Sequence, residues 1–280
     1  VAAEAAQFDH MSKGRFILGI GPGALATDFQ LFGNEEGWAR LRKCLESIDM
    51  IGKIWAGGPP YDIKGEFYSL TVDKNIVEEL GTGYMPKPYQ QPQPPIACSL
   101  MSPSPGLGKI AGERGWIPVS ANFVPTYAVA SHWVKYLEGC EAAKRKADPN
   151  EWRVCRSIIV ADSDEEARAV VFDPKGTLNY YFSYVWKALS LANYTIVMKA
   201  DPNQPDAEVT LEMLLEDMVI YGSPKTVAGK LRALQDKTGR FGRLVAAMPD
   251  WGYNRPAHEK SMRLLASEVL PKLQVERVVA

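Results

Sequence analysis

Apolar and polar positions along the chain follow a helical period in some stretches and form short apolar runs in others. Helical spacing covers residues 1–12 and about 36–55, where the apolar positions are Leu41, Leu45, Ile48, Ile51 and Ile54. Further helices are predicted at about 125–147, 223–235 and 256–273. The apolar runs predict five buried strands, at 15–21, 96–100, 117–121, 153–161 and 243–248. Strands that alternate with helices indicate an α/β protein with a parallel sheet.

Three stretches interrupt this alternation. Residues 61–70 predict a small hairpin around Gly65, and the proline-rich residues 84–95 cannot be helical. Residues of about 167–219 are mostly helical in pattern, so we interpret them as a helical insertion rather than another strand–helix unit. The sequence contains no internal repeat and no clear domain boundary, which predicts a single domain over residues 1–280.

Composition excludes several classes of function. The 32 basic residues balance 33 acidic ones, so the charge gives no reason to expect a nucleic acid or an anionic membrane as partner. The 4 scattered cysteines suit free thiols in the cytoplasm, and the 3 histidines lie at no metal-ligand spacing, so we expect no metal. No apolar run approaches the roughly 20 residues that span a bilayer.

A glycine-rich end follows the first predicted strand, with Gly19, Gly21 and Gly23 at every second position. Glycines at a strand end let a ligand approach the backbone because no Cβ stands in the way. A dinucleotide fingerprint would open directly into a helix, but the next strong helical pattern starts only near residue 36. The remaining interpretations are a strand end that accommodates a ring or a phosphate, and a glycine-rich end without a ligand.

Three further segments could carry chemistry. Arg40 lies in the first turns of an amphipathic helix, where an exposed arginine is often only solvated; its neighbours Arg42 and Lys43 are expected to face solvent. Ser102 and Ser104 lie between a strand and a helix, where hydroxyls and free N–H groups can hold a phosphate, although a plain serine-capped turn fits as well. His258 and the pair 250–251 follow the last strand, and a helix-capping region explains them equally well.

Several blocks in order resemble the bacterial-luciferase-like, two-component flavin monooxygenases. They are Asp9-x-Met11-Ser12-x-Gly14-Arg15-Phe16, Gly19-x-Gly21-x-Gly23, Asp28-Phe29-x-x-Phe32-Gly33, Arg40, Ser102-x-Ser104, Leu107-x-x-Ile110-Ala111-Gly112-Glu113-Arg114-Gly115, Tyr221-Gly222-Ser223-Pro224 and Ser261-Met262-x-Leu264-Leu265-Ala266-x-Glu268-Val269-x-Pro271. The resemblance spans nearly the whole chain, and the closing blocks are similar to the limonene- and ketone-oxidising branches.

The resemblance implies a (β/α)8 TIM-type barrel that forms a homodimer and binds reduced FMN from a separate NAD(P)H:flavin reductase. It would place Gly21, Pro22 and Gly23 beside the isoalloxazine ring, while Arg40, Ser102 and Ser104 would hold the phosphate. Candidates for an apolar substrate pocket are Phe29, Met101, Phe123 and Trp251. No catalytic residue is assigned, because the family's catalytic histidine lies on an early part of the barrel that has no counterpart here.

The strand count bears on this expectation. Five strands against eight leave three strand–helix units unaccounted for, equivalent to about 90–100 residues ahead of Val1. We therefore expect the given sequence to lack the first units of the barrel.

The implied reaction relies on the cofactor. Reduced FMN and O2 would form a C4a-(hydro)peroxyflavin that oxidises a small apolar ketone, aldehyde or terpene. Two alternatives remain, a deazaflavin-dependent oxidoreductase on the same barrel and a flavin-binding protein without catalysis.

Overall fold

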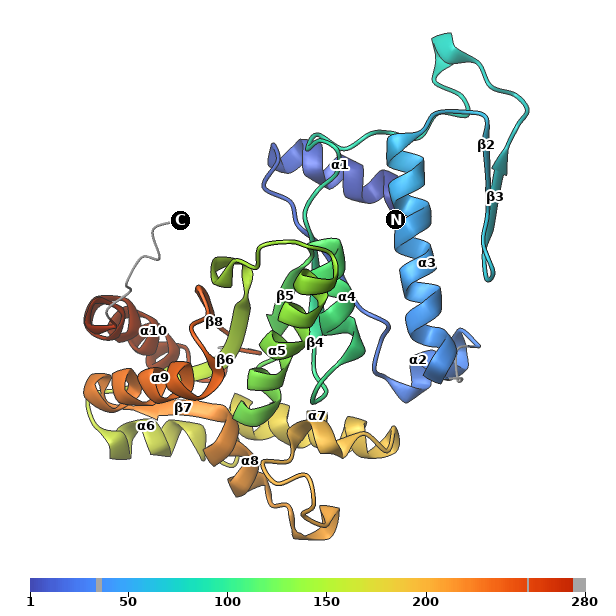
Figure 1. Ribbon diagram of the computed structural model, residues 1–280. Helices are drawn as coiled ribbons and strands as arrows, with labels where there is room; N and C mark the ends of the chain where they lie inside the picture. Colours follow the sequence, from blue (N-terminus) through green and yellow to red (C-terminus); the bar gives the residue numbers. More distant parts are fainter. Residues whose placement is uncertain (34–36, 251, 274–280) are drawn as a thin grey trace. The chain divides into compact units, whose positions relative to one another are not determined.

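The computed structural model describes residues 1–33, 37–250 and 252–273, and Figure 1 labels its helices and strands. The chain divides into two compact units, Val1–Cys98 and Ser99–Ala280. The single domain predicted over residues 1–280 stays a prediction. None of the described helices is both long and apolar enough to cross a bilayer.

The unit Val1–Cys98 is built on a long helix and a short parallel strand pair. Strand β1 runs parallel to β4, with Leu18 opposite Ile96 and Ile20 opposite Cys98. Strands β2 and β3 form the antiparallel hairpin predicted around Gly65. The elements in chain order are α1 (Ala2–Ser12), β1 (Leu18–Ile20), α2 (Ala26–Leu31), α3 (Gly37–Ala56), β2 (Tyr61–Lys64), β3 (Ser69–Val72), η1 (Glu78–Leu80) and β4 (Ile96–Leu100), the last crossing the boundary between the units.

The first strand is shorter than predicted, because it covers 18–20 rather than 15–21. A side chain takes over one of the backbone groups that a longer strand would pair: the Gln90 amide donates to the Phe16 carbonyl over 2.8 Å. Gln90 is held in turn by the buried Asp9 carboxylate, which accepts its backbone N–H and its side-chain amide, each over 2.7 Å. The strand is also not buried as predicted, because Gly19 is exposed.

The hairpin is anchored to α3 by one carboxylate. Glu46 accepts backbone hydrogen bonds from Glu66, Phe67 and Tyr68 at 2.9, 3.0 and 2.8 Å. Desolvation would raise the pKa of Glu46, but these three bonds and the charge of Arg42 outweigh it and lower that pKa. The carboxylate therefore stays ionised and holds the hairpin loop at neutral pH.

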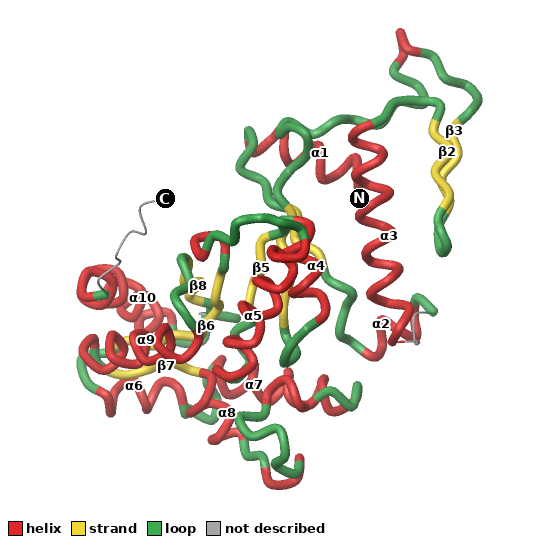
Figure 2. Tube along the Cα trace, in the orientation of Figure 1, coloured by secondary structure: helices red, strands yellow, loops and turns green. Residues whose placement is uncertain are grey.

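The unit Ser99–Ala280 alternates strands and helices, as Figure 2 shows from β5 onward. Strand β6 pairs in parallel with β5, β7 and β8, with Val119 opposite Arg153, Ser157 opposite Val219 and Arg153 opposite Arg243. The predicted α/β class with a parallel sheet is confirmed. The elements are α4 (Gly106–Arg114), β5 (Ile117–Ser120), α5 (Thr126–Ala142), η2 (Pro149–Glu151), β6 (Arg153–Val160), α6 (Asp164–Val171), α7 (Thr177–Leu191), η3 (Thr195–Met198), η4 (Asp206–Glu208), α8 (Leu211–Met218), β7 (Val219–Gly222), α9 (Pro224–Thr238), β8 (Arg243–Ala246), α10 (Arg255–Leu264), η5 (Leu265–Val269) and η6 (Leu270–Lys272).

The count of five parallel strands was wrong, because β7 is an additional one within the described residues. Its four residues follow α8 without a turn, so their apolar pattern merges with that of the helix. The expectation of three unaccounted strand–helix units came from subtracting five strands from the eight of a barrel, so it does not hold as stated. The stretch of 167–219 contains the end of α6 and all of α7 and α8, and its status as an insertion stays a prediction.

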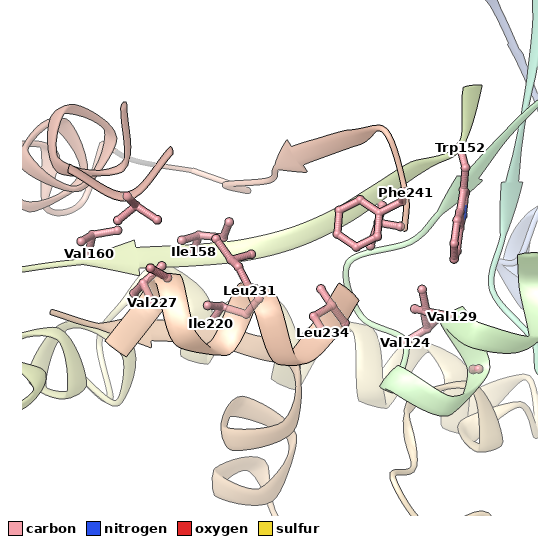
Figure 3. Close-up of a cluster of buried hydrophobic side chains, with 14 residues drawn as sticks. Val124, Val129, Trp152, Ile158, Val160, Ile220, Val227, Leu231, Leu234 and Phe241 are labelled. Carbon is pink, nitrogen blue, oxygen red and sulfur yellow. The ribbon is translucent and has the colours of Figure 1, made fainter. Parts of the chain in front are cut away.

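A buried cluster joins β6 and β7 to the helices that pack on them (Figure 3). Ile158 and Val160 of β6 lie against Val227 and Leu231 of α9 in this cluster, while Trp152 stands edge-on to the Phe241 ring. Trp152 also stacks on Trp133 of α5 with ring centroids 5.1 Å apart. This core fixes α5 against the sheet and so sets the position of the residues that α5 presents to its neighbours.

Candidate functional site

A cavity of about 340 Å³ opens in the unit Val1–Cys98 at the end of β1. One wall is a single face of α3, because residues spaced by three or four positions lie on the same side of a helix. The other walls come from the strand end, the N-terminus and the hairpin. The lining residues are Val1, Gly19, Ile20, Gly21, Pro22, Arg40, Lys43, Cys44, Ser47, Ile48, Ile51 and Tyr68.

The glycines leave the strand side of this cavity open. A Cβ placed on Gly19 or Gly21 would meet no atom within 4 Å, so a flat group can approach the backbone there. Gly23 has φ of +82° and lies next to Phe29, whose ring a Cβ would approach to 3.4 Å. The structure thus brings Gly21 and Pro22 to one cavity with Arg40, while Gly23 lies beside Phe29 rather than in the lining.

Arg40 is positioned by an aromatic ring. Its guanidinium lies 3.8 Å from the centroid of the Phe29 ring, which provides a cation–π contact. Phe29 was predicted to line an apolar substrate pocket, and in this structure one face of its ring meets a cation. Lys43 was expected to face solvent, but it lines the cavity one helical turn after Arg40. Spacing of three on a helix could have found it.

Cys44 is one side chain of the cavity wall that could act as a nucleophile. Burial raises its pKa, so at neutral pH it is a thiol rather than a thiolate. Cys98 behind it is fully buried, and burial, with a further contribution from Cys44, raises its pKa to about 12. All four cysteines are free, as predicted.

The other predicted cofactor residues lie in the unit Ser99–Ala280, in the loop between β4 and α4. Ser102 is half-buried and Ser104 is exposed. No side chain caps the N-terminus of α4, whose N-cap is Pro105. Uncapped N–H groups and the positive end of the helix dipole favour an anion. The role of Ser102 and Ser104 in holding a phosphate stays a prediction.

A second group of polar residues comes from the loop after β5, from β6 and from α7, and it was not found from the sequence. The Tyr181 hydroxyl donates to the Asn122 carbonyl oxygen over 3.0 Å, and the Asn122 amide donates to Ser157 over 3.1 Å. Arg156 is 2% exposed and donates to the carbonyls of Ala121 and Cys155. Burial lowers the pKa of Arg156 to about 10, so it still carries a positive charge at neutral pH.

The remaining candidates are placed as follows. Met101 and Phe123 are half-buried and pack against the same buried cluster. Trp251 lies outside the described residues. His258 is buried, and desolvation lowers its pKa against the opposing charge of Asp250. Among the described residues, no group of three or more His, Cys, Asp or Glu side chains could hold a metal ion.

Comparison with known proteins points to one family. The family profile described as luciferase-like monooxygenase matches residues 1–240. The 2,5-diketocamphane 1,2-monooxygenase 1 of Pseudomonas putida is 28% identical over 98% of this chain and 76% of its own length. Limonene 1,2-monooxygenase of Rhodococcus erythropolis is 28% identical over 97% of this chain and 64% of its own length.

Structural comparison agrees. The oxygenating constituent of 3,6-diketocamphane monooxygenase from Pseudomonas putida, solved in complex with FMN, matches with a TM-score of 0.80 and 27% identity. The match covers 97% of this chain and 75% of that chain. A relative with another cofactor is the F420-dependent glucose-6-phosphate dehydrogenase of Amycolatopsis mediterranei, 24% identical over 98% of this chain and 74% of its own length.

Proposed function

The chain belongs to the luciferase-like monooxygenase family, and from that premise we propose that it is a flavin-dependent monooxygenase that uses reduced FMN and O2. Its substrate is a small apolar ketone, aldehyde or terpene, by analogy with the diketocamphane and limonene monooxygenases. A separate NAD(P)H:flavin reductase supplies the reduced flavin, and the working form is a homodimer. The parallel α/β fold is consistent with the (β/α)8 barrel of the family.

The observation that carries this proposal is the cavity at the end of β1. Its strand side has no side chain at Gly19 and Gly21, which fits the flat isoalloxazine ring, and Arg40 and Lys43 on its α3 side suit an anionic cofactor. The volume of about 340 Å³ lies at the lower end of the range for small-molecule sites. The residues present therefore fit FMN.

Within Val1–Cys98, Gly21, Pro22 and Gly23 lie along the ring in this proposal, and Arg40 neutralises phosphate charge. Within Ser99–Ala280, Ser102 and Ser104 donate hydroxyl hydrogen bonds to the phosphate. When bound, reduced flavin supplies the activation of O2 and the transfer of one oxygen atom. The apolar side chains Met101 and Phe123 exclude water from the substrate, and the same is proposed for Phe29 and Trp251.

The test is the origin of the oxygen atom in the product. We expect the purified chain, a flavin reductase, NADH and FMN to convert at least one member of a ketone, aldehyde and terpene panel. Mass spectrometry should show one ¹⁸O atom per product molecule when the reaction runs under ¹⁸O2. This readout is insensitive to the oxidation of free reduced flavin, which consumes O2 without making product.

The second candidate is an F420-dependent oxidoreductase, favoured by the relative from Amycolatopsis mediterranei. Oxidation of an alcohol substrate under nitrogen, coupled to the reduction of F420, would support this candidate and contradict the monooxygenase. FMN binding without product in either assay would support a flavin-binding protein without catalysis.

A further inference from the structure

The loop between β4 and α4 is attached to α5 by two consecutive residues. His132 Nε2 lies 3.0 Å from the carbonyl oxygen of Ser102, and the backbone N–H of Ser104 donates to Ser131 Oγ over 2.7 Å. The Ser131 hydroxyl itself donates to the carbonyl of Ala128, also over 2.7 Å, which fixes its orientation. Both predicted phosphate serines therefore take their backbone positions from α5.

The hydrogen bonds around His132 fix its tautomer. The Ser102 carbonyl can only accept, so Nε2 carries the proton and donates to it. Burial lowers the pKa of His132 to about 4, which leaves Nδ1 bare at neutral pH. Ser120 Oγ lies 2.9 Å from Nδ1 and accepts from Trp152 Nε1 over 3.0 Å, so the Ser120 hydroxyl donates to Nδ1.

The result is a directed chain of hydrogen bonds from Trp152 through Ser120 and His132 to Ser102. Trp152, Ser120 and His132 are all fully buried, and the Trp152 ring is held by its stacking on Trp133. Because every group in the chain has its partner, the network has one low-energy arrangement. The network therefore holds the Ser102 backbone at a fixed position relative to the buried core.

Ser104 has an unusual backbone conformation that depends on this attachment. Its φ is +48°, in the left-handed region that residues other than glycine rarely adopt. Such a conformation persists where the surrounding structure over-determines it. Its N–H bond to Ser131 supplies that constraint, and the close approach of α4 to α5 at Gly108 supports it, because a Cβ there would lie 3.2 Å from Lys135 Cβ.

We propose that His132 and Ser131 are positioning residues for the phosphate of FMN. They touch no cofactor; they hold the backbones of Ser102 and Ser104 so that both hydroxyls and the N-terminus of α4 face one anion. This inference rests on the proposed function, because it concerns the phosphate half of the same cofactor.

The experiment compares the affinity of the full chain for reduced FMN with its affinity for reduced riboflavin, which lacks the phosphate. Dissociation constants are measured by anaerobic ultrafiltration for the wild type, Ser131→Ala, His132→Phe and His132→Gln. Ser190→Ala is the matched control, because its hydroxyl also donates to a carbonyl of its own helix, α7, away from the loop.

We expect Ser131→Ala and His132→Phe to lower the preference for FMN over riboflavin by roughly fivefold to tenfold, the effect of losing one hydrogen bond. The riboflavin affinity should not change. His132→Gln should retain most of the preference, because its amide can still donate to the Ser102 carbonyl. Ser190→Ala should behave as the wild type.

The outcomes distinguish a failure of the proposed phosphate site from a failure of the positioning role of Ser131 and His132. A wild type that binds FMN and riboflavin equally would overturn the phosphate site of the proposed function. A wild type that prefers FMN, with Ser131→Ala unchanged in that preference, would overturn the positioning role alone. If His132→Phe does not fold, Ser131→Ala decides the question, because a half-buried serine in a helix tolerates alanine.

Discussion

His132 shows how a single buried side chain can serve structure without a charge. Its pKa falls to about 4 because burial disfavours the charged ring and the positive Arg156 lies near it; these effects outweigh the hydrogen bond to the Ser102 carbonyl, which raises the pKa. In the unfolded chain it titrates near the ordinary value of 6.5. Between these values the unfolded chain holds more protons than the folded one, so stability is full above about pH 6.5 and is lost as the pH falls towards 4.

This gives a prediction for the residue. When the pH is lowered from about 7.5 to about 5, the titration of His132 should reduce the wild type's free energy of unfolding by about 2 kcal/mol. His132→Gln has no titrating group at this position and should lack that part of the loss. Urea denaturation of both proteins at the two pH values measures the difference. Equal losses in the two proteins would show that His132 titrates normally in the folded chain.

At the scale of elements, helices α4 and α5 pack closely because glycines stand where they meet. A Cβ on Gly112 would overlap the carbonyl oxygen of Tyr136, and one on Gly139 would overlap that of Lys109. The Gly112 carbonyl also lies 3.7 Å from the buried Cys140 sulfur. The interface that carries the β4–α4 loop thus depends on the absence of two side chains.

We therefore expect Gly112→Ala to destabilise the protein by about 2 kcal/mol, the cost of overpacking a close contact. Gly229→Ala in α9 is the matched control, because its Cβ would meet no atom within 4 Å. In an exposed helix interior this change should stabilise by about 0.5–1 kcal/mol. The midpoints of urea denaturation should shift in opposite directions, and a shift of Gly112→Ala towards higher urea would contradict the packing argument.

At the scale of the whole molecule, binding of the cofactor should appear as stability. A ligand at a hundredfold excess over its dissociation constant adds about 2.7 kcal/mol to the free energy of unfolding. Reduced FMN should therefore raise the melting temperature of the wild type in anaerobic calorimetry, and the increase should grow with the FMN concentration. Arg40→Gln should need about tenfold more FMN for the same increase, because a charge-assisted bond is lost.

Lys53→Gln is the matched control for this measurement. It removes a positive charge from the same helix, but Lys53 lines a separate hollow that includes neither Arg40 nor the glycines at the end of β1. Its FMN dependence should equal that of the wild type. The same loss in both variants would mean that α3 attracts FMN through its overall charge rather than through Arg40.

Sequence reasoning was most successful where a pattern had one physical meaning. The apolar stripe of α3 and the prolines of 86–95 left few alternatives, and both predictions are confirmed. Sequence reasoning missed β7, because a strand of four residues is too short to show a hydrophobic periodicity. At the candidate site it singled out Arg40, which lines the cavity, but not His132. The role of this buried histidine depends on Ser120 and Trp152, which lie 12 and 20 positions away in the sequence.

The Glu46 anchor has a consequence for protein engineering. This carboxylate accepts only main-chain N–H groups of residues 66–68, so the three bonds do not depend on the side chain at Tyr68. Tyr68 nevertheless reaches the cavity wall. A library built at Tyr68 would therefore vary the chemistry of the cavity on an unchanged frame, which makes this position a natural entry point for directed evolution.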